Sequence, residues 1–186
     1  HRDGGMYEVE LKCRADHEAL REQLDELDAE HVDSRSQNDT YYNAPHRDFA
    51  ETDEALRVRY EQPTEGEPVT KLTYKGPLVE QESKTREEHE TAVDDDQALT
   101  GVLSGLGFEP AARVEKNREF YALDGYTITL DSVRDLGEFV EIERETTEAE
   151  VEAVREGAVE LLSELGLDPD EQIRTSYLGL LLADEP

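Results

Sequence analysis

Charged and apolar residues alternate along several short segments of this chain, and this alternation constrains the fold more than any other feature. In the segment YEVELKC, residues 7–13, one face carries Glu8, Glu10 and Lys12, and the other carries the residues between them. Strict alternation over seven residues is typical of a β-strand with two chemically different faces. It leaves open whether the charged face meets water or an enclosed polar space, with the apolar face beneath covering helices.

Similar segments follow along the rest of the chain. We expect eight strands, close to residues 7–13, 32–44, 55–62, 69–77, 83–93, 108–123, 126–133 and 137–145. Apolar residues at helical spacing predict four helices, within residues 16–30, 94–107, 146–166 and 170–183. The turn sequences PTEGEP and DG indicate hairpins, and no strand–helix–strand alternation requires a parallel sheet. The pattern predicts an α+β fold built on an antiparallel sheet.

The charge of the chain is strongly negative. Its 186 residues include 48 Asp and Glu against 19 Lys and Arg, which gives a formal net charge of -29. We interpret this as adaptation to a high-salt cytoplasm, because in molar salt the Debye length falls to about 3 Å and an acidic surface repels itself less. An acidic surface argues against nucleic acid or a membrane as partner, since both require a basic footprint.

The remaining composition favours one cytoplasmic domain. Cys13 is the single cysteine, so an intrachain disulfide is impossible. No apolar run approaches the roughly 18 residues of a membrane helix. We expect residues 1–5 to be an expression remnant, residues 6–183 to form a single domain and residues 184–186 to be a tail.

The distribution of lysine bears on the direction of the charged faces. Every lysine lies in or at the start of an expected strand, and none lies in an expected helix: Lys12, Lys71, Lys75, Lys84 and Lys116. Bases that face solvent should be scarce on so acidic a surface. Eight strands can also close into a barrel whose alternate residues face the lumen. From the residues alone, an open sheet with a solvated charged face and an inward charged face are about equally supported.

An inward charged face would suit metal-assisted phosphate chemistry. Carboxylates that share strand faces offer hard oxygen ligands for Mg²⁺ or Mn²⁺. Converging Arg and Lys side chains suit the oxygens of a polyphosphate, which they bind by charge-assisted hydrogen bonds. Phosphoryl or nucleotidyl transfer requires both, because positioning and charge neutralisation supply most of its catalysis.

Several motifs, taken in order, resemble the CYTH proteins, the triphosphate tunnel metalloenzymes. The segment EVELK is similar to the ExExK signature of that family, and the resemblance extends from Met6 to about Leu182. The other motifs are DTYY, ALRVRY, TYKGP, TREEHE, VEKNREFY, LDSVRDLGEFVEIE and RTSYLGLL. The class IV adenylyl cyclase branch is the most similar branch.

The resemblance implies an eight-stranded antiparallel closed β-barrel, the triphosphate tunnel, with peripheral helices. It implies that divalent metal is held by Glu8, Glu10, Asp131, Glu141 and Glu143. It implies that the triphosphate is bound by Lys12, Arg57, Arg59, Lys71, Lys75, Arg86, Lys116 and Arg118. The residues expected to act directly in catalysis are Glu8, Glu10, Lys12, Lys75 and Lys116.

The resemblance makes a metal-dependent enzyme the first hypothesis. That enzyme is an adenylate cyclase that converts ATP to cyclic AMP and pyrophosphate with Mg²⁺ or Mn²⁺. One alternative is a triphosphatase acting on inorganic triphosphate, thiamine triphosphate or a nucleotide. The other is a non-catalytic module that binds polyphosphate. The branch resemblance also favours a homodimer.

Other residues that could suggest chemistry have simpler interpretations. Cys13 lies on the apolar face and is expected in the core, and His89 has the wrong parity for a charged face. Glu88 and Glu90 are expected to pair with bases rather than bind metal. Tyr177 is expected to pack within a helix or to contact another subunit rather than to take part in catalysis.

Overall fold

The structure is a computed structural model that describes residues 7–80 and 85–183, with side chains for residues 8–77 and 87–183. Residues 1–5, Lys84 and residues 184–186, for which the sequence made predictions, lie outside the described residues. So does the side chain of Arg86. The boundaries of the expected single domain stay a prediction.

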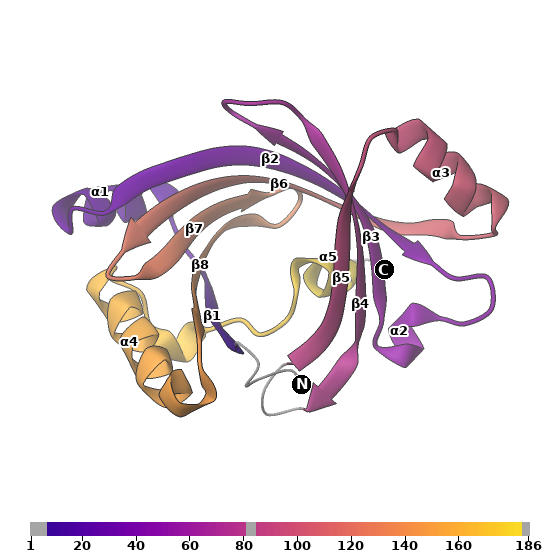
Figure 1. The fold of residues 1–186 in the computed structure, drawn as a ribbon. Helices are drawn as coiled ribbons and strands as arrows, with labels where there is room; N and C mark the ends of the chain where they lie inside the picture. Colours follow the sequence, from indigo (N-terminus) through magenta and orange to yellow (C-terminus); the bar gives the residue numbers. More distant parts are fainter. Residues whose placement is uncertain (1–6, 81–84, 184–186) are drawn as a thin grey trace. The chain divides into compact units, whose positions relative to one another are not determined.

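Within the described residues the chain forms eight strands and five α-helices (Figure 1). The strands are β1 (Tyr7–Arg14), β2 (Glu30–Asn43), β3 (Ala55–Pro63), β4 (Val69–Glu80), β5 (Thr85–Val93), β6 (Glu109–Leu123), β7 (Tyr126–Val133) and β8 (Gly137–Thr146). The helices are α1 (His17–Glu26), α2 (Phe49–Thr52), α3 (Asp96–Gly105), α4 (Val151–Glu164) and α5 (Tyr177–Ala183). Two short 3-10 helices, η1 (Glu148–Glu150) and η2 (Pro169–Glu171), flank α4.

The strands form one sheet in the order β1-β8-β7-β6-β2-β3-β4-β5. Pairs β1–β8, β7–β8, β2–β3, β3–β4 and β4–β5 are antiparallel. The predicted eight-stranded antiparallel sheet with helices is therefore confirmed. Closure of the barrel is not: β1 and β5 end the order, and no hydrogen-bonded ladder joins them within the described residues.

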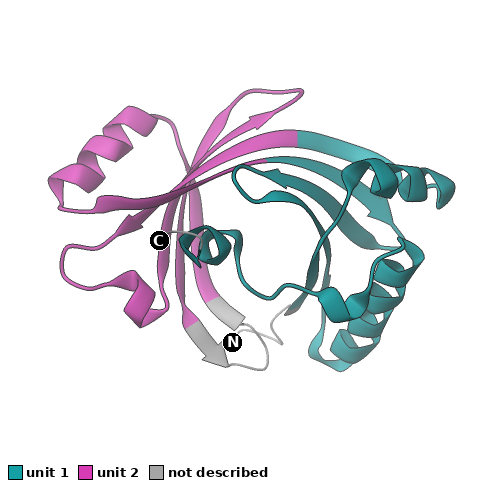
Figure 2. Cartoon of the chain, turned by 180° about the vertical axis from the view of Figure 1, so that it is seen from behind, with its two compact units in different colours: residues 1–34, 117–186 teal, residues 35–116 magenta. Residues whose placement is uncertain are grey.

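The chain divides into two compact units (Figure 2). Unit 1 comprises residues 1–34 and 117–186, and unit 2 comprises residues 35–116. The long strands β2 and β6 run through both units, and every other described strand and helix belongs to one of them.

In unit 1, the apolar strand faces are covered by helices. Leu11 of β1 pairs with Ile142 of β8, and Ile142 pairs with Ile128 of β7, so the three side chains form a row across the sheet. Side chains of α1 and α4, such as Leu24 and Leu162, pack against this row and complete the core. Because alternate residues face opposite sides of a strand, the charged face of the opening segment is the opposite one, away from the covering helices.

Local signals set the ends of these elements. Asp16 caps α1, because its Oδ1 accepts hydrogen bonds from the backbone N–H groups of Glu18 and Ala19 at 2.9 and 3.3 Å. The predicted hairpin at DG joins β6 to β7. Asp124 and Gly125 have φ values of 53° and 84°, the left-handed conformation that a two-residue turn between strands requires.

The C-terminal helix differs from the prediction. The sequence predicts one helix over residues 170–183, but α5 begins only at Tyr177. Between η2 and α5 the backbone N–H of Ile173 donates to the carbonyl of Lys12 at 2.7 Å. A bond to β1 thus replaces the intrahelical bond that the helical spacing predicted.

In unit 2, the register of three strands places the charged side chains on one face. Arg59 of β3 pairs with Asp39 of β2 and with Lys71 of β4. Two residues along, Arg57 pairs with Tyr41 and with Thr73. Since alternate residues share a face, the basic side chains of β3 and β4 lie on the same side of the sheet.

The helix-covered core of unit 1 should dominate stability. Leu162 of α4 is fully buried, whereas Leu106 after α3 is 64% exposed. We expect Leu162→Ala to lower the free energy of unfolding by about 3 kcal/mol, because it leaves a cavity. Leu106→Ala should change it by less than about 0.5 kcal/mol. Urea unfolding in molar KCl measures both, and equal effects would contradict the assigned core.

Candidate functional site

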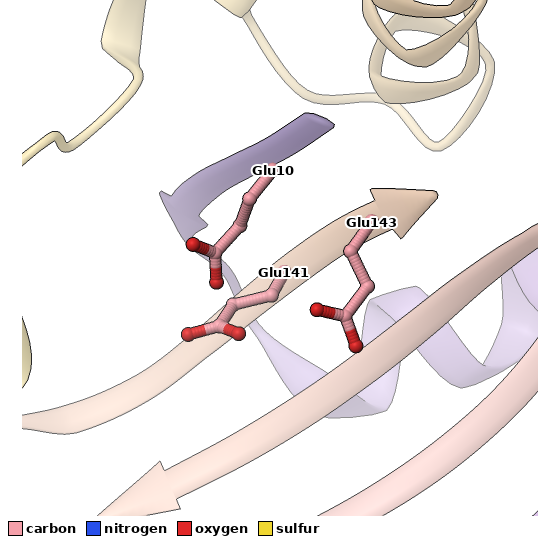
Figure 3. Close-up of side chains that lie close together, drawn as sticks. All are labelled: Glu10, Glu141 and Glu143. Carbon is pink, nitrogen blue, oxygen red and sulfur yellow. The ribbon is translucent and has the colours of Figure 1, made fainter. Parts of the chain in front are cut away.

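Three carboxylates from two strands of unit 1 form a compact acidic cluster. Glu10 of β1 pairs with Glu143 of β8, and Glu141 lies two residues before Glu143 on the same face. One oxygen of each of these side chains lies within 4.8 Å of the others. Figure 3 shows the three side chains pointing toward one another. This arrangement could hold a metal ion, because hard oxygen donors are the ligands that Mg²⁺ and Mn²⁺ prefer.

The electrostatics of the cluster favour a cation. Burial, a hydrogen bond with Glu8 and the charges of Glu141 and Glu10 raise the pKa of Glu143 to about 9. Like charges held this close cannot all ionise unless a positive charge neutralises them. The residues present therefore fit a divalent metal: the structure brings together three of the five predicted ligands, Glu10, Glu141 and Glu143, and a fourth, Glu8, interacts with Glu143.

Asp131, the fifth predicted ligand, is occupied by other partners. Its carboxylate is fully buried and accepts from Arg118 Nε at 2.7 Å and from the Tyr177 hydroxyl at 2.7 Å. A second guanidinium nitrogen, Nη2 of Arg118, donates to Asp131 at 3.2 Å and to Glu141 at 3.0 Å. The role of Asp131 as a metal ligand stays a prediction. The contacts observed are those of a residue that orients Arg118.

Arg118 is one of two predicted triphosphate-binding residues in unit 1. Burial alone would lower the pKa of Arg118, but the charges of Asp131 and Glu141 raise it, so the guanidinium stays charged. The other residue is Lys12, which pairs with Glu141 in the β1–β8 register. The Nζ atom of Lys12 lies 4.4 Å from the centre of the Tyr177 ring.

The other described bases of the predicted set lie in unit 2. Arg59 binds Asp39 through two parallel hydrogen bonds, Nε to Oδ1 at 2.7 Å and Nη2 to Oδ2 at 2.8 Å. The Nζ atom of Lys116 lies 3.8 Å from Asp39 Oδ2. Although burial would raise the pKa of Asp39, the hydrogen bonds and charge of Arg59 lower it below the ordinary value. Asp39 therefore stays ionised and holds two of the predicted bases together.

Two more bases in unit 2 are also paired with carboxylates. Arg57, which is buried, donates to Thr73 at 3.3 Å and lies 3.5 Å from Glu90. Lys71 donates to Glu61 at 3.4 Å. The interpretation of Glu90 as a partner of bases is confirmed by its contact with Arg57.

A cluster around Glu61 extends the charged face. Glu61 is buried and accepts hydrogen bonds from Arg35 at 2.9 Å and from Gln37 at 2.6 Å. Gln37 and Asp39 are alternate residues of β2, so they share the face that carries Arg59. The basic face of unit 2 is therefore held in shape by buried carboxylates.

Sequence reasoning missed Asp39, Glu61 and Tyr177. The first two could have been found, because Asp39 shares its parity with Gln37 and Glu61 shares its parity with Arg57 and Arg59. Tyr177 gave no such signal, since it follows an irregular segment. The expectation that Tyr177 serves in packing is only part of its role: its ring lies edge-on to Phe139, with centroids 5.0 Å apart, and its hydroxyl binds Asp131.

The interpretations of Cys13 and His89 agree with the structure. Cys13 is buried in the core of unit 1 as a free thiol. His89 lies on the face of β5 opposite to Glu88 and Glu90, and it contacts Glu87 at 2.6 Å. None of the described helices has both the length and the apolar character needed to cross a membrane.

Comparison with known proteins identifies relatives along nearly the whole chain. The CYTH domain model matches residues 6–177. A protein of Methanocaldococcus jannaschii named "Putative adenylate cyclase" is 38% identical over 177 residues, which are 94% of this chain and 98% of that protein.

Solved structures of similar fold also cover nearly the whole chain. The protein PH1819 of Pyrococcus horikoshii has a TM-score of 0.83 and 40% identity, covering 96% of this chain and 100% of that one. An adenylyl cyclase-like protein of Hippeastrum, described as having a dominant triphosphatase activity, has a TM-score of 0.68 and 21% identity. Here the coverage is 98% of this chain and 97% of that one.

The pKa of Glu143 leads to a prediction about stability without metal. Its folded-state value of about 9 lies above its ordinary value of 4.5, so Glu143 stabilises the fold fully only below about pH 4.5. This contribution is lost as the pH rises toward 9. We expect Glu143→Gln, which stays neutral, to gain stability relative to the unaltered chain between pH 5 and 9.

Urea unfolding with a chelator at pH 5, 7 and 9 measures this difference. The same titration with excess Mn²⁺ is the control, because a bound cation should remove the advantage of the variant. If the free energies of unfolding of Glu143→Gln and the unaltered chain changed in parallel with pH in the chelator, the pKa of Glu143 would not be raised by its neighbours as described.

Proposed function

This chain belongs to the CYTH family, and from that membership we propose that it is a divalent-metal-dependent adenylate cyclase that converts ATP to cyclic AMP and pyrophosphate. The observation that carries the proposal is the cluster of Glu10, Glu141 and Glu143, whose carboxylate oxygens lie within 4.8 Å of one another. The name of the Methanocaldococcus relative supports the choice of reaction. On the resemblance alone, we extend the tunnel architecture of the family to this chain.

In this proposal the acidic cluster holds Mg²⁺ or Mn²⁺, with Glu8 beside it. When bound, the metal would neutralise charge on the phosphate oxygens and favour ionisation of the attacking hydroxyl. The residues of the chain determine where the metal would be held. Glu141 is oriented by Arg118, whose Nη2 donates to it at 3.0 Å, and Arg118 is fixed in turn by Asp131.

The basic residues bind the triphosphate of the substrate. We assign this role to Lys12, Arg57, Arg59, Lys71, Lys75, Arg86, Lys116 and Arg118. Charge-assisted hydrogen bonds from these bases are strong, and the internal carboxylates Asp39 and Glu61 hold Arg59 and Lys71 in place before the substrate arrives. Little ordering is then needed on binding, which favours affinity.

In the cyclase reaction, one bond to the α-phosphorus forms and one breaks. The ribose 3′-oxygen forms a bond to the α-phosphorus while the bond from that phosphorus to the leaving pyrophosphate breaks, and the hydroxyl proton is released. The basic residues would neutralise the charge that develops on pyrophosphate. Among them, Lys12, Lys75 and Lys116 are proposed to act directly in this step, together with Glu8 and Glu10.

A triphosphatase is the second candidate, and the activity described for the Hippeastrum protein of the same fold supports it. Water would then attack the terminal phosphorus of inorganic triphosphate, thiamine triphosphate or a nucleotide. The same acidic cluster and the same bases serve both reactions, because both need a cation and a bound triphosphate. A polyphosphate-binding module without turnover is the third candidate, and the intact acidic cluster counts against it.

The first experiment separates these candidates by their products. The chain is incubated in molar KCl with Mg²⁺ or Mn²⁺, on ATP and on inorganic triphosphate separately, and the products are resolved by chromatography. We expect cyclic AMP and pyrophosphate in equal amounts from ATP. Orthophosphate without cyclic product would establish a triphosphatase, and binding without any product would establish the third candidate.

Two carboxylate variants provide the matched control. Glu10→Ala removes a member of the acidic cluster, whereas Glu160→Ala removes an exposed carboxylate of α4. We expect Glu10→Ala to lower turnover by at least about a hundredfold, because loss of a direct ligand should cost no less than the largest losses typical of outer-shell partners. Full activity in Glu10→Ala would refute the metal assignment, whichever product forms.

The basic face of unit 2 makes a separate prediction. Lys116→Ala should weaken the binding of inorganic triphosphate by about tenfold or more, since hydrogen bonds to charged groups contribute about 1.5–3 kcal/mol. The control is Arg155→Ala, which removes an exposed cation of α4. Isothermal titration with a chelator present measures both. Equal affinities would remove Lys116 from the triphosphate site.

A further inference from the structure

Tyr177, the first residue of α5, contacts two residues of the candidate site with opposite ends of its side chain. Its hydroxyl donates to Asp131 Oδ2 at 2.7 Å, and its ring lies 4.4 Å from Lys12 Nζ. The ring also packs edge-on to Phe139, and the side chain is only 6% exposed. The segment before it is tied to β1 by the bond from Ile173 N–H to the Lys12 carbonyl.

The hydroxyl stands at the start of a chain of hydrogen bonds that ends on a candidate metal ligand. Tyr177 binds Asp131, Asp131 binds Arg118 and Arg118 donates to Glu141 at 3.0 Å. The Nη2 atom of Arg118 is shared between Asp131, at 3.2 Å, and Glu141. Without the Tyr177 hydroxyl, Asp131 Oδ2 would lose one of its hydrogen-bond donors. The Nη2 atom of Arg118 would then move toward Asp131 Oδ2 and away from Glu141.

The ring acts on a different residue. Lys12 is a flexible, strongly hydrated cation, and the face of an aromatic ring attracts and restrains such a cation. Lys12 is also opposite Glu141 in the β1–β8 register, so its position bears on both the acidic cluster and any phosphate bound near it.

We propose that Tyr177 is a positioning residue that orients the metal ligand Glu141 through its hydroxyl and the triphosphate-binding Lys12 through its ring. This inference deepens the proposed function and rests on its metal and triphosphate site. It holds for either reaction, because neither contact depends on which phosphorus is attacked. Removal of the hydroxyl and removal of the ring therefore have different consequences.

Two substitutions at this position separate the two contacts. Tyr177→Phe removes the hydroxyl and keeps the ring, and it should weaken Mn²⁺ binding by about tenfold. Tyr177→Leu removes both, so it should also weaken the binding of inorganic triphosphate, by about threefold or more.

Tyr126→Phe is the matched control. Tyr126 is similarly buried in unit 1, and its hydroxyl also makes one hydrogen bond of 2.7 Å, to the carbonyl of Val154 in α4. Loss of the Tyr126 hydroxyl should lower the stability of the fold by about as much as loss of the Tyr177 hydroxyl. It should not change the binding of Mn²⁺ or triphosphate. Thermal unfolding of all variants, without metal, compares the stability costs directly.

Paramagnetic resonance titration of Mn²⁺ and calorimetric titration of inorganic triphosphate give the readouts, and neither requires turnover. Weakened Mn²⁺ binding in Tyr177→Phe but not in Tyr126→Phe supports the inference. Equal Mn²⁺ affinity in the unaltered chain and Tyr177→Phe overturns it while leaving the proposed metal site intact. Failure of the unaltered chain to bind Mn²⁺ overturns the metal site and this inference together.

Discussion

The pairing of charge on strand faces is the constraint on which the rest of this structure depends. A charged group that loses contact with water is costly unless an opposite charge or a hydrogen-bond donor compensates it. Asp131 and Asp39 are almost completely buried, and each accepts two hydrogen bonds from a single arginine. The positions of Arg118 and Arg59 follow from this requirement before any ligand is considered.

The two units satisfy this constraint differently. In unit 2, the described contacts pair bases with carboxylates, as in Arg59 with Asp39 and Lys71 with Glu61. In unit 1, Glu10, Glu141 and Glu143 lie close together, and burial together with the neighbouring carboxylates raises the pKa of Glu143 to about 9. In the proposed function, the acidic cluster of unit 1 binds the cation, and the internally paired basic face of unit 2 is preorganised to bind the anion.

Much of this could be predicted from the sequence, because strand parity is a local property. The alternation of Glu8, Glu10 and Lys12 placed them on one face, and the same reasoning applied to Arg57 with Arg59 and to Glu141 with Glu143. Parity does not give register, which decides that Glu10 lies opposite Glu143 and that Asp39 lies opposite Arg59. The role of Tyr177 was beyond reach, because it depends on an irregular segment held to β1 by Ile173, where helical spacing predicted a helix.

The same charge pairing explains why an intact site does not select one reaction. In the proposed function the acidic cluster recognises a cation and the bases recognise phosphate oxygens, and neither group of contacts distinguishes the α-phosphorus from the terminal one. Selection must come from residues that place the rest of the substrate, since the ribose hydroxyl reacts only when the nucleoside holds it in line with the α-phosphorus, whereas attack by water on the terminal phosphorus does not require a positioned nucleoside. On this argument the two proposed reactions differ in the fit of the nucleoside, and the proposed roles of Glu141, Arg118 and Tyr177 are the same for both.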